Sequence, residues 1–389
     1  MNVEIQRDFA RGDRRLPFAS VALVLQGGGS LGAYQAGVYE ALAEAGIHPN
    51  WIAGTSIGAI NAAIIAGNPP SLRVDRLREF WMQVTAGGFW PRPANSGSRV
   101  GRGDTARNLL NQMSANFAIA CGAKGFFAVR PIPWLQPPGT IEATSFYDTA
   151  ALRETLNRLV DFDRINAGTP RFSAGAVNVR TGNLVYFDTS TRTIRAEHVM
   201  ASGALPPGFP AVEIDGEYYW DGGLVSNTPL QWVVDSRPRS DTLVFQVDLW
   251  NTRGEFPSNM LEVITREKEI RYSSRTRAST DQFKHTQRLR IAIAKLIHQL
   301  PEALKQSPEA KLLATVADNQ VYNIVHLIYR ARNYEGFSKD YEFSRLSMEE
   351  HWRAGYHDAR RTLRHSDALE RPADGEGVST FDLHVDGRD

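Results

Sequence analysis

The sequence predicts an α/β layered domain over residues 18–250 and a mainly α-helical region over residues 251–370. Between residues 20 and 249, short apolar runs of strand length alternate with longer segments of helical period, as in layered α/β proteins. Beyond residue 250 the apolar residues recur at helical spacing. Residues 1–17 are expected to form an N-terminal arm, and the polar residues 371–389 a disordered tail.

Local patterns place the elements in order along the chain. Three helices are predicted: residues 31–44, which Gly46 ends, residues 72–84, and a last helix that the capping-box pattern at Ser347 opens. Turn signals join two pairs of strand-type runs into hairpins. The predicted strands are 20–25, 51–53, 172–179, 184–187, 212–214, 218–220 and 242–249.

Two segments leave alternatives open. Residues 87–139 are irregular and carry the apolar pairs Phe126-Phe127 and Trp134-Leu135, so they form either a lid beside a functional site or a satellite core beneath a long loop. Residues 261–300 carry nine Lys/Arg against four Asp/Glu. That excess indicates either a surface for lipid headgroups or a solvated helical face packed on the α/β domain.

Residues 54–58 read Gly-Thr-Ser-Ile-Gly, between a short strand and a helical stretch of small residues. This is the pattern of a nucleophile elbow, in which a serine on a strained strand-to-helix turn needs small neighbours such as Gly54 and Gly58. The turn raises the Ser56 hydroxyl towards a substrate, and the helix N-terminus presents N–H groups to a developing oxyanion. Ser56 is therefore a candidate nucleophile.

A glycine-rich loop, Gly27-Gly28-Gly29-Ser30-Leu31-Gly32, follows the first predicted strand. It satisfies the dinucleotide-binding pattern G-x-G-x-x-G, but that fold needs an acidic residue at the end of the second strand, which here ends without one. Consecutive glycines beside a helix also expose the backbone N–H groups that an oxyanion hole needs. We interpret the loop as an oxyanion loop, with a nicotinamide-dependent oxidoreductase as the competing hypothesis.

A serine nucleophile needs a base, and histidine is scarce in this part of the chain. His48 is expected at the end of the sheet opposite the elbow, and His198 in a helix with a structural role. Asp221 follows an aromatic strand and precedes Gly222-Gly223, so its carboxylate is expected at a strand end that can approach the elbow. A simple Asp-Gly turn is the alternative interpretation.

Together the three motifs, with Asn227 and Pro229 after the third, resemble the patatin-like phospholipase family over residues 21–249. The segment 341–345 resembles part of a helical extension found on some bacterial members. The resemblance implies a three-layer α/β/α sandwich and a Ser56–Asp221 catalytic dyad. It further implies that Gly27, Gly28 and Gly29 form an oxyanion loop and that the N–H of Ile57 is an extra donor. The glycines that support the motifs would be Gly32, Gly54, Gly58, Gly222 and Gly223.

The implied activity is that of a serine lipid acyl hydrolase, of phospholipase A or esterase type, which cleaves carboxylic esters through an acyl-enzyme without metal or cofactor. The family loop usually carries Arg or Lys where Leu31 stands, so a neutral-ester or hydroxyacyl-ester hydrolase of the same mechanism is the alternative. A membrane-surface scaffold with an inactive site is the third hypothesis. The sequence leaves acyl-chain and headgroup preference open.

Composition limits the partners. The formal net charge of +1 gives no indication of nucleic-acid binding, and a single cysteine excludes an intrachain disulfide framework. No run approaches the ~18–20 apolar residues of a membrane span. We therefore expect a lipid or ester substrate and a cytoplasmic location, with at most peripheral contact at the inner membrane surface. The oligomeric state cannot be read from the sequence.

Overall fold

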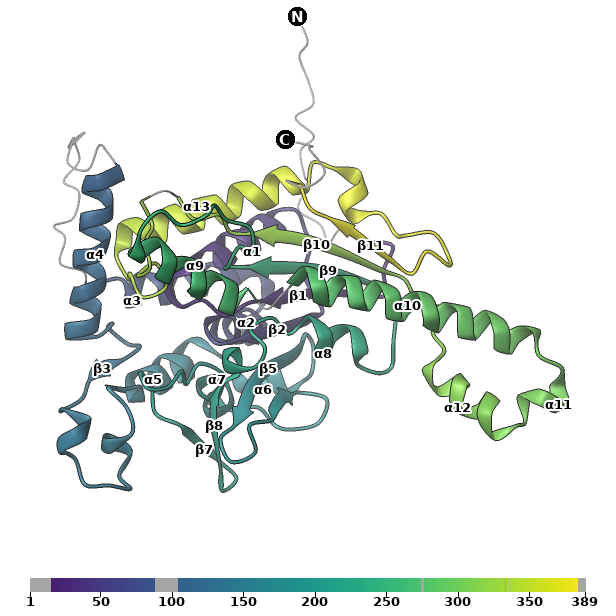
Figure 1. The fold of residues 1–389 in the computed structure, drawn as a ribbon, viewed down its shortest axis with the longest axis horizontal. Helices are drawn as coiled ribbons and strands as arrows, with labels where there is room; N and C mark the ends of the chain where they lie inside the picture. Colours follow the sequence, from purple (N-terminus) through teal and green to yellow (C-terminus); the bar gives the residue numbers. More distant parts are fainter. Residues whose placement is uncertain (1–14, 88–103, 274–275, 333, 384–389) are drawn as a thin grey trace, which may run out of the picture.

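The computed structural model describes residues 15–87, 104–273, 276–332 and 334–383 (Figure 1). Within these residues the main sheet has nine strands, in the order β11-β10-β9-β1-β2-β5-β8-β7, with β6 also paired to β5. The strands from β11 to β5 are parallel, whereas β6 and β8 run antiparallel to β5, and β7 antiparallel to β8. The strands span Ser20–Leu25 (β1), Trp51–Thr55 (β2), Arg171–Asn178 (β5), Leu184–Asp188 (β6), Val212–Ile214 (β7), Glu217–Asp221 (β8), Thr242–Asp248 (β9), Tyr322–Ile328 (β10) and Val378–Phe381 (β11).

Helices cover both faces of the sheet, because successive side chains of each strand enter two different apolar clusters. In β1, Leu23 and Leu25 belong to the larger cluster with α1, α2 and α13, whereas Ala22 and Val24 belong to the smaller one with α8 and α10. This arrangement confirms the predicted α/β/α sandwich. The helices span Ala33–Glu44 (α1), Ile57–Ala66 (α2), Arg73–Val84 (α3), Ala150–Leu159 (α5), Phe162–Asn166 (α6), Ala196–Ser202 (α7), Leu230–Asp235 (α8), Met260–Tyr272 (α9), Thr276–Gln299 (α10), Glu302–Lys305 (α11), Pro308–Val316 (α12) and Arg345–Thr362 (α13).

The segment expected to be irregular, residues 87–139, contains the 18-residue helix α4 (Asp104–Cys121). Phe126 and Phe127 are buried in the larger cluster, as the satellite-core interpretation predicts. Trp134 and Leu135, by contrast, are 79% and 77% exposed. The exposed segment with Trp134 and Leu135 connects the two strands of a short hairpin, β3 (Ala128–Val129) and β4 (Tyr147–Asp148). Residues 88–103 lie outside the described residues, and the lid hypothesis stays a prediction.

The C-terminal region is not a separate helical domain, because it completes the sheet and shares its core. Strand β10 pairs with β9, and β11 pairs with β10. Helix α13 also crosses α1 at backbone contact. A Cβ on Gly37 would lie 1.9 Å from the Trp352 carbonyl oxygen, and one on Gly355 would lie 2.0 Å from the Tyr34 carbonyl oxygen. The predicted boundary at residue 250 therefore does not separate two independent cores.

Two further C-terminal predictions are wrong. The tail predicted to be disordered from residue 371 contains β11, and Arg371 pairs with Asp241 at 2.7 Å. Helix α13 begins before the predicted capping box, because the Ser344 side chain accepts a hydrogen bond from the Ser347 N–H at 3.2 Å. Most of the predicted N-terminal arm, residues 1–14, and the last residues, 384–389, lie outside the described part of the chain.

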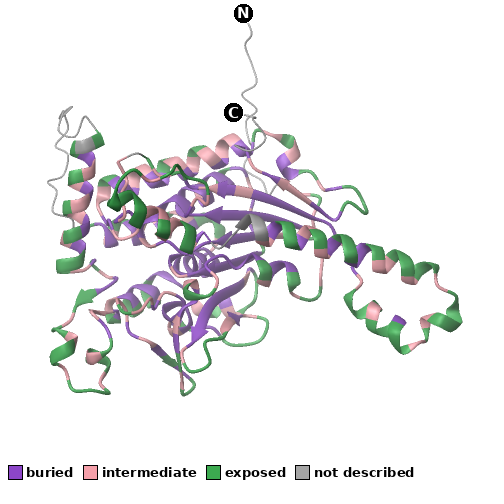
Figure 2. Ribbon diagram, viewed as in Figure 1, coloured by how far each residue is buried: buried purple, intermediate pink, exposed green. Residues whose placement is uncertain are grey.

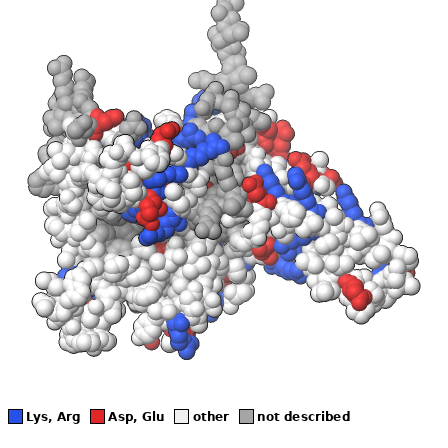
Figure 3. Space-filling view, viewed as in Figure 1, with Lys and Arg blue, Asp and Glu red and all other residues white. Residues whose placement is uncertain are grey.

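Helices α10 to α12 form an arm that extends from the sheet (Figure 1). Its base is anchored by Phe283, which is buried in the smaller cluster. Further out the arm is mostly exposed, and Leu296, Leu304 and Leu312 each have more than half of their surface in solvent (Figure 2). On the face seen in Figure 3, Lys and Arg are interspersed with Asp and Glu. The base of α10 thus packs on the sheet, while binding of lipid headgroups by residues 261–300 stays a prediction.

Candidate active site

Ser56 lies on the turn between β2 and α2, with φ 56° and ψ −127°. A positive φ at a non-glycine residue is strained, which is typical of a nucleophile elbow. The Ser56 N–H donates to both the carbonyl oxygen and Oγ of Ser202, at 3.1 and 3.0 Å. A Cβ on Gly54 would lie 2.3 Å from the Gly58 backbone, and one on Gly58 would lie 2.3 Å from the Leu25 carbonyl. The close approach of helix and strand therefore requires both glycines.

Asp221 reaches Ser56 because β2 and β8 share one edge of β5. Strand β2 pairs with β5 as far as Thr55, which lies opposite Gly175. At the next residue of β5, Ala176, the partner becomes Asp221 at the end of β8. The other edge of β5 is occupied by β6 along the same stretch. Two strands that run in opposite directions thus abut, and residues that are 165 positions apart in sequence (221 − 56) meet at the junction.

The Asp221 carboxyl group is 2% exposed. Burial raises its pKa from 3.8 to about 7, because desolvation disfavours the charged form. Hydrogen bonds from the Ser56 side chain and the Gly223 N–H act in the opposite direction, because they favour the carboxylate. The Gly223 N–H donates to Asp221 Oδ1 at 2.7 Å. Gly222 lets this turn approach β5, since a Cβ there would lie 2.5 Å from the Gly175 carbonyl oxygen. A pKa near neutrality suits a general base.

The glycine loop lies beside the elbow, and the structure assigns its N–H groups different tasks. Gly27 is not a free donor as predicted, because its N–H donates to the Asn227 carbonyl at 3.1 Å. It lacks a side chain because a Cβ would lie 2.2 Å from Asn227 Oδ1. In the part of the chain that the structure describes, no acceptor takes the N–H of Gly28, Gly29 or Ile57. These three groups are the remaining candidate oxyanion donors.

The remaining motif glycine, Gly32, joins the loop to the elbow helix. Its carbonyl accepts a hydrogen bond from Asn61 Nδ2 of α2 at 2.9 Å. A Cβ at Gly32 would lie 2.6 Å from the Ile57 side chain, so the two segments pack without room for a larger residue. The elbow and the loop are therefore positioned as one unit.

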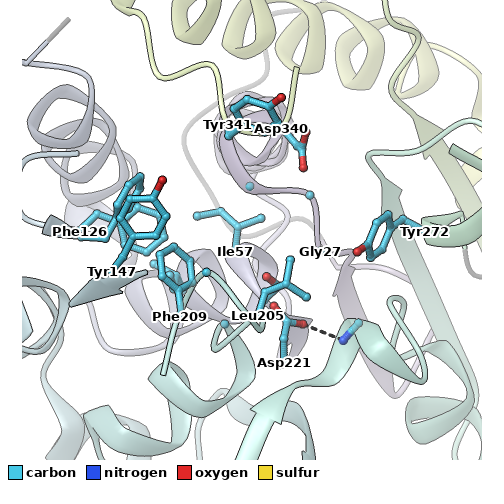
Figure 4. A pocket seen from close by; sticks show the side chains of 18 of the residues that line it. Gly27, Ile57, Phe126, Tyr147, Leu205, Phe209, Asp221, Tyr272, Asp340 and Tyr341 are labelled. Atoms are coloured by element: carbon cyan, nitrogen blue, oxygen red, sulfur yellow. Dashed lines mark hydrogen bonds between the residues drawn. The ribbon is translucent and has the colours of Figure 1, made fainter. Parts of the chain in front are cut away.

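A cavity of about 320 Å³ opens over these residues (Figure 4). One side is apolar and aromatic, with Phe126, Phe127, Tyr147, Phe209 and Phe343 in mutual ring contact. The other side carries Trp250, Tyr272, Asp340 and Tyr341 from the second half of the chain. Ser56 and Asp221 also line the cavity. The volume falls at the lower end of the range for small-molecule sites, roughly 300–1,000 Å³.

Histidine contributes nothing to this cavity: none of the described lining residues is histidine, and none is Lys or Arg. His198 has the structural role expected of it, because its Nδ1 accepts the Arg195 N–H at 2.9 Å at the start of α7. Burial lowers the pKa of His198 to about 4. Asp221, whose side chain hydrogen-bonds that of Ser56, therefore remains the candidate base.

The described residues contain neither a metal-type cluster nor a membrane-spanning helix. No group of three or more His, Cys, Asp or Glu residues is placed to hold a metal ion. No helix of the described chain is long and apolar enough to cross a membrane.

Sequence reasoning missed several residues that build the site. Asn227 lies within the third motif, which does not reveal its role, and Ser202 is the last residue of helix α7, whose relation to the elbow the sequence does not reveal. Trp250 donates from Nε1 to the Gly27 carbonyl at 2.9 Å. Tyr272 and Asp340 come from the region interpreted as a separate domain, so no motif linked them to the elbow.

Comparison with known proteins shows the family of the chain. A family model described as patatin-like phospholipase matches residues 23–233, more than half of the chain, and one described as patatin phospholipase matches residues 270–375. The chain therefore belongs to the patatin-like phospholipase family.

The curated relatives align over short stretches. Lysophospholipase nte1 of Aspergillus terreus is 58% identical over 59 residues, which cover 15% of this chain and 4% of that protein. The uncharacterized NTE family protein Rv2565 of Mycobacterium tuberculosis is 35% identical over 117 residues, or 30% of this chain and 20% of that protein. The chain thus spans a small fraction of these relatives. The solved structure of VipD from Legionella pneumophila matches with a TM-score of 0.38 and 15% identity, over 95% of this chain and 73% of that one.

Proposed function

We propose that this protein is a serine lipid acyl hydrolase in which Ser56 is the nucleophile and Asp221 its general base. The observation that carries the proposal is the junction on β5, where a strained serine meets a buried carboxylate whose pKa is raised to about 7. Membership of the patatin-like phospholipase family supports a lipid hydrolase activity. Such perturbed carboxyl groups cluster at functional sites.

The proposed reaction has two steps. Asp221 accepts the Ser56 proton as Oγ attacks the acyl carbonyl, and the N–H groups of Gly28, Gly29 and Ile57 bind the oxyanion. The protonated Asp221 then gives its proton to the departing alkoxide, which leaves as an alcohol or lysolipid. Water attacks the acyl-enzyme with Asp221 again as base, and the proton returns to Ser56 as the fatty acid leaves.

The two sides of the cavity suit the two parts of a lipid ester. We infer that the acyl chain packs among the aromatic side chains around Phe126 and Phe209, where apolar burial is favourable. The alcohol portion would then lie near Tyr272 and Asp340. Leu31 is uncharged and buried, and none of the described lining residues is Lys or Arg, so the cavity offers no cation for a phosphate. Neutral and hydroxyacyl esters are therefore alternative substrates beside phospholipids.

We further propose that the substrate is taken from a lipid surface through peripheral contact. Ile119 lines the cavity and is 45% exposed, and Trp134 and Leu135 lie exposed in the following segment. Exposed apolar and aromatic side chains of this kind favour the membrane interface. Flotation with liposomes should recover the wild type and lose Trp134→Ser. Flotation without turnover of any ester would instead favour the scaffold hypothesis.

The test of the activity is a panel of phospholipids, monoacyl esters and hydroxyacyl esters, assayed with wild type and Ser56→Ala. We expect hydrolysis by the wild type and a loss of at least about 10⁴-fold in Ser56→Ala, because the nucleophile is removed. Ser236→Ala is the matched control, since Ser236 bonds only the end of α8. Circular dichroism of all three proteins checks folding. Undiminished turnover by Ser56→Ala would overturn the proposal.

A further inference from the structure

A segment of the C-terminal region, residues 339–340, lies directly against the glycine loop. The Ser30 N–H donates to the Asp340 carbonyl at 2.7 Å, and Ser30 Oγ donates to the Lys339 carbonyl at 2.6 Å. The approach is so close that a Cβ on Gly29 would lie 2.0 Å from the Asp340 carbonyl oxygen, and Gly29 has φ +57°. Figure 4 shows Asp340 and Tyr341 above the loop, on the far side of the cavity from Asp221.

Two ion pairs fasten this segment to helix α9. Lys268 Nζ lies 2.5 Å from Asp340 Oδ1 and also donates to the Phe337 carbonyl at 3.3 Å. Lys339 Nζ lies 2.6 Å from Glu269 Oε1. The Lys339 side chain is 4% exposed, and the other three side chains are also mostly buried. Ion pairs so shielded from solvent are screened less than surface pairs.

Helix α9 also reaches the other end of the loop. It ends at Tyr272, whose carbonyl accepts a hydrogen bond from Asn227 Nδ2 at 2.8 Å. The same Nδ2 donates to the Gly27 carbonyl at 2.9 Å. The loop is thus held at Gly27 through Asn227 and at Ser30 through residues 339–340, with the candidate donors Gly28 and Gly29 between these two points.

We propose that residues 339–340, fastened to α9 by Lys268 and Lys339, are a positioning element that holds the Gly28 and Gly29 amides in the geometry that binds the oxyanion. This inference rests on the proposed function. Oxyanion donors work because they are fixed before the reaction, and misplacement of a catalytic group by about 1 Å can cost on the order of a hundredfold in rate. Ser30 and Lys268 act through the loop, so they are positioning residues.

The first test replaces the side chain that bonds the segment. Ser30→Ala should lower kcat about tenfold and leave KM within about twofold, because the donors act on the transition state. The rate of labelling by a fluorophosphonate should fall in the same proportion. Ser236→Ala is the control, since its hydroxyl also donates to a backbone carbonyl at 2.6 Å, far from the loop. If Ser30→Ala keeps the kcat of this control, the inference is wrong.

The second test loosens the segment from α9. Lys268→Met should lower kcat severalfold at constant KM, and Lys268→Arg should restore most of the rate, because it keeps a cation opposite Asp340. Lys305→Met removes a more exposed pair of similar length, with Glu302 at 2.7 Å on the arm, and should change nothing. A positioning role would be contradicted if the kcat of Lys268→Met fell only in proportion to a lower Tm. It would also be contradicted if Lys268→Arg did not restore kcat.

A third readout does not depend on activity. Hydrogen exchange of the peptide that contains residues 27–32 should be at least about tenfold faster in Ser30→Ala and Lys268→Met than in the two controls, because the Asp340 carbonyl that accepts the residue-30 N–H is then held less firmly against the loop. Unchanged exchange would overturn the inference. A wild type that neither hydrolyses esters nor reacts with the fluorophosphonate would instead overturn the proposed function, while exchange still reports on the segment.

Discussion

Two regions hold the glycine loop, and they differ in how they do so. Within the part matched by the patatin-like family model, the side chains of Asn61 and Asn227 bond the carbonyls of Gly32 and Gly27. In the C-terminal region, the backbone carbonyls of Lys339 and Asp340 receive both hydrogen bonds from Ser30. The comparison teaches that the site depends on both halves of the chain, although the recognisable motifs lie in one half.

The largest effect should come from removing the Asn227 side chain, which holds the loop within the part matched by the family model. Asn227→Ala removes both Nδ2 bonds and leaves the Gly27 and Tyr272 carbonyls without this donor, so we expect kcat to fall on the order of a hundredfold. Steady-state kinetics on the best ester of the panel measures it. Asn166→Ala is a matched control, since Asn166 bonds both the N–H and the carbonyl of Ile194 away from the site. Equal activity of the two variants would refute the role of Asn227.

The contact between α1 and α13 should control stability. Gly355→Ala places a methyl group 2.0 Å from the Tyr34 carbonyl oxygen, a backbone atom that cannot move aside alone, so we expect a loss of about 2–3 kcal/mol in the free energy of unfolding. Urea denaturation measures the change. Gly87→Ala serves as control, because a Cβ at Gly87 meets nothing within 4 Å. A Gly355→Ala protein as stable as this control would show that the two regions are not packed as described.

The pH dependence separates activity from stability. The pKa of Asp221 is about 7, and the base must be ionised, so kcat/KM should rise with pH and fall about tenfold per unit below pH 7. The pKa of the Asp221 carboxyl is higher in the folded state than its unfolded value of 3.8. Protonation of this carboxyl therefore stabilises the fold fully below pH 3.8, and the stabilisation is lost as the pH rises through about 7.

The Asp221→Asn variant tests the predicted dependence of stability on pH. It should be more stable than the wild type at pH 8, and the difference should shrink as the pH falls towards 4, because the wild-type carboxyl then becomes neutral as well. Thermal unfolding across this range measures it. A flat pH–rate profile would contradict the raised pKa. So would a stability gain of Asp221→Asn over wild type that is smaller at pH 8 than at pH 5.

The smallest effect should come from the arm. Leu296→Ser changes a largely exposed residue of α10, so we expect unfolding free energy within about 0.5 kcal/mol of wild type and unchanged kcat. Denaturation and the ester assay together check this. A substantial loss of either would show that the arm has a role in the monomer that its exposure does not indicate.

The residues of the site differ in how far the sequence could predict them. Ser56 and Asp221 were predictable because tight turns demand glycine neighbours, and those glycines leave a pattern. Gly27 was assigned to the wrong task, because a motif does not reveal which N–H groups already have acceptors. Asp340 gave no signal at all, since its contribution to the loop is a backbone carbonyl that any residue carries.

The strands of the sheet also differ in how far the sequence could predict them. Strands β1, β2 and β9 are buried apolar runs and were predicted, whereas β10 and β11 were missed because helical patterns surround one and polar residues the other. Their place in the sheet depends on the pairing of β10 with β9, whose partner residues lie 80 positions earlier (322 − 242), and of β11 with β10. Local patterns do not encode such long-range contacts.

The most direct test of the account is the site at which a fluorophosphonate attaches. Peptide mapping by mass spectrometry of the labelled wild type should place the adduct on Ser56, and labelling should be lost in Ser56→Ala and strongly slowed in Asp221→Asn at pH 8. An adduct on another residue, or labelling of Asp221→Asn at the wild-type rate, would contradict the central claim that Ser56 and Asp221 form the catalytic pair.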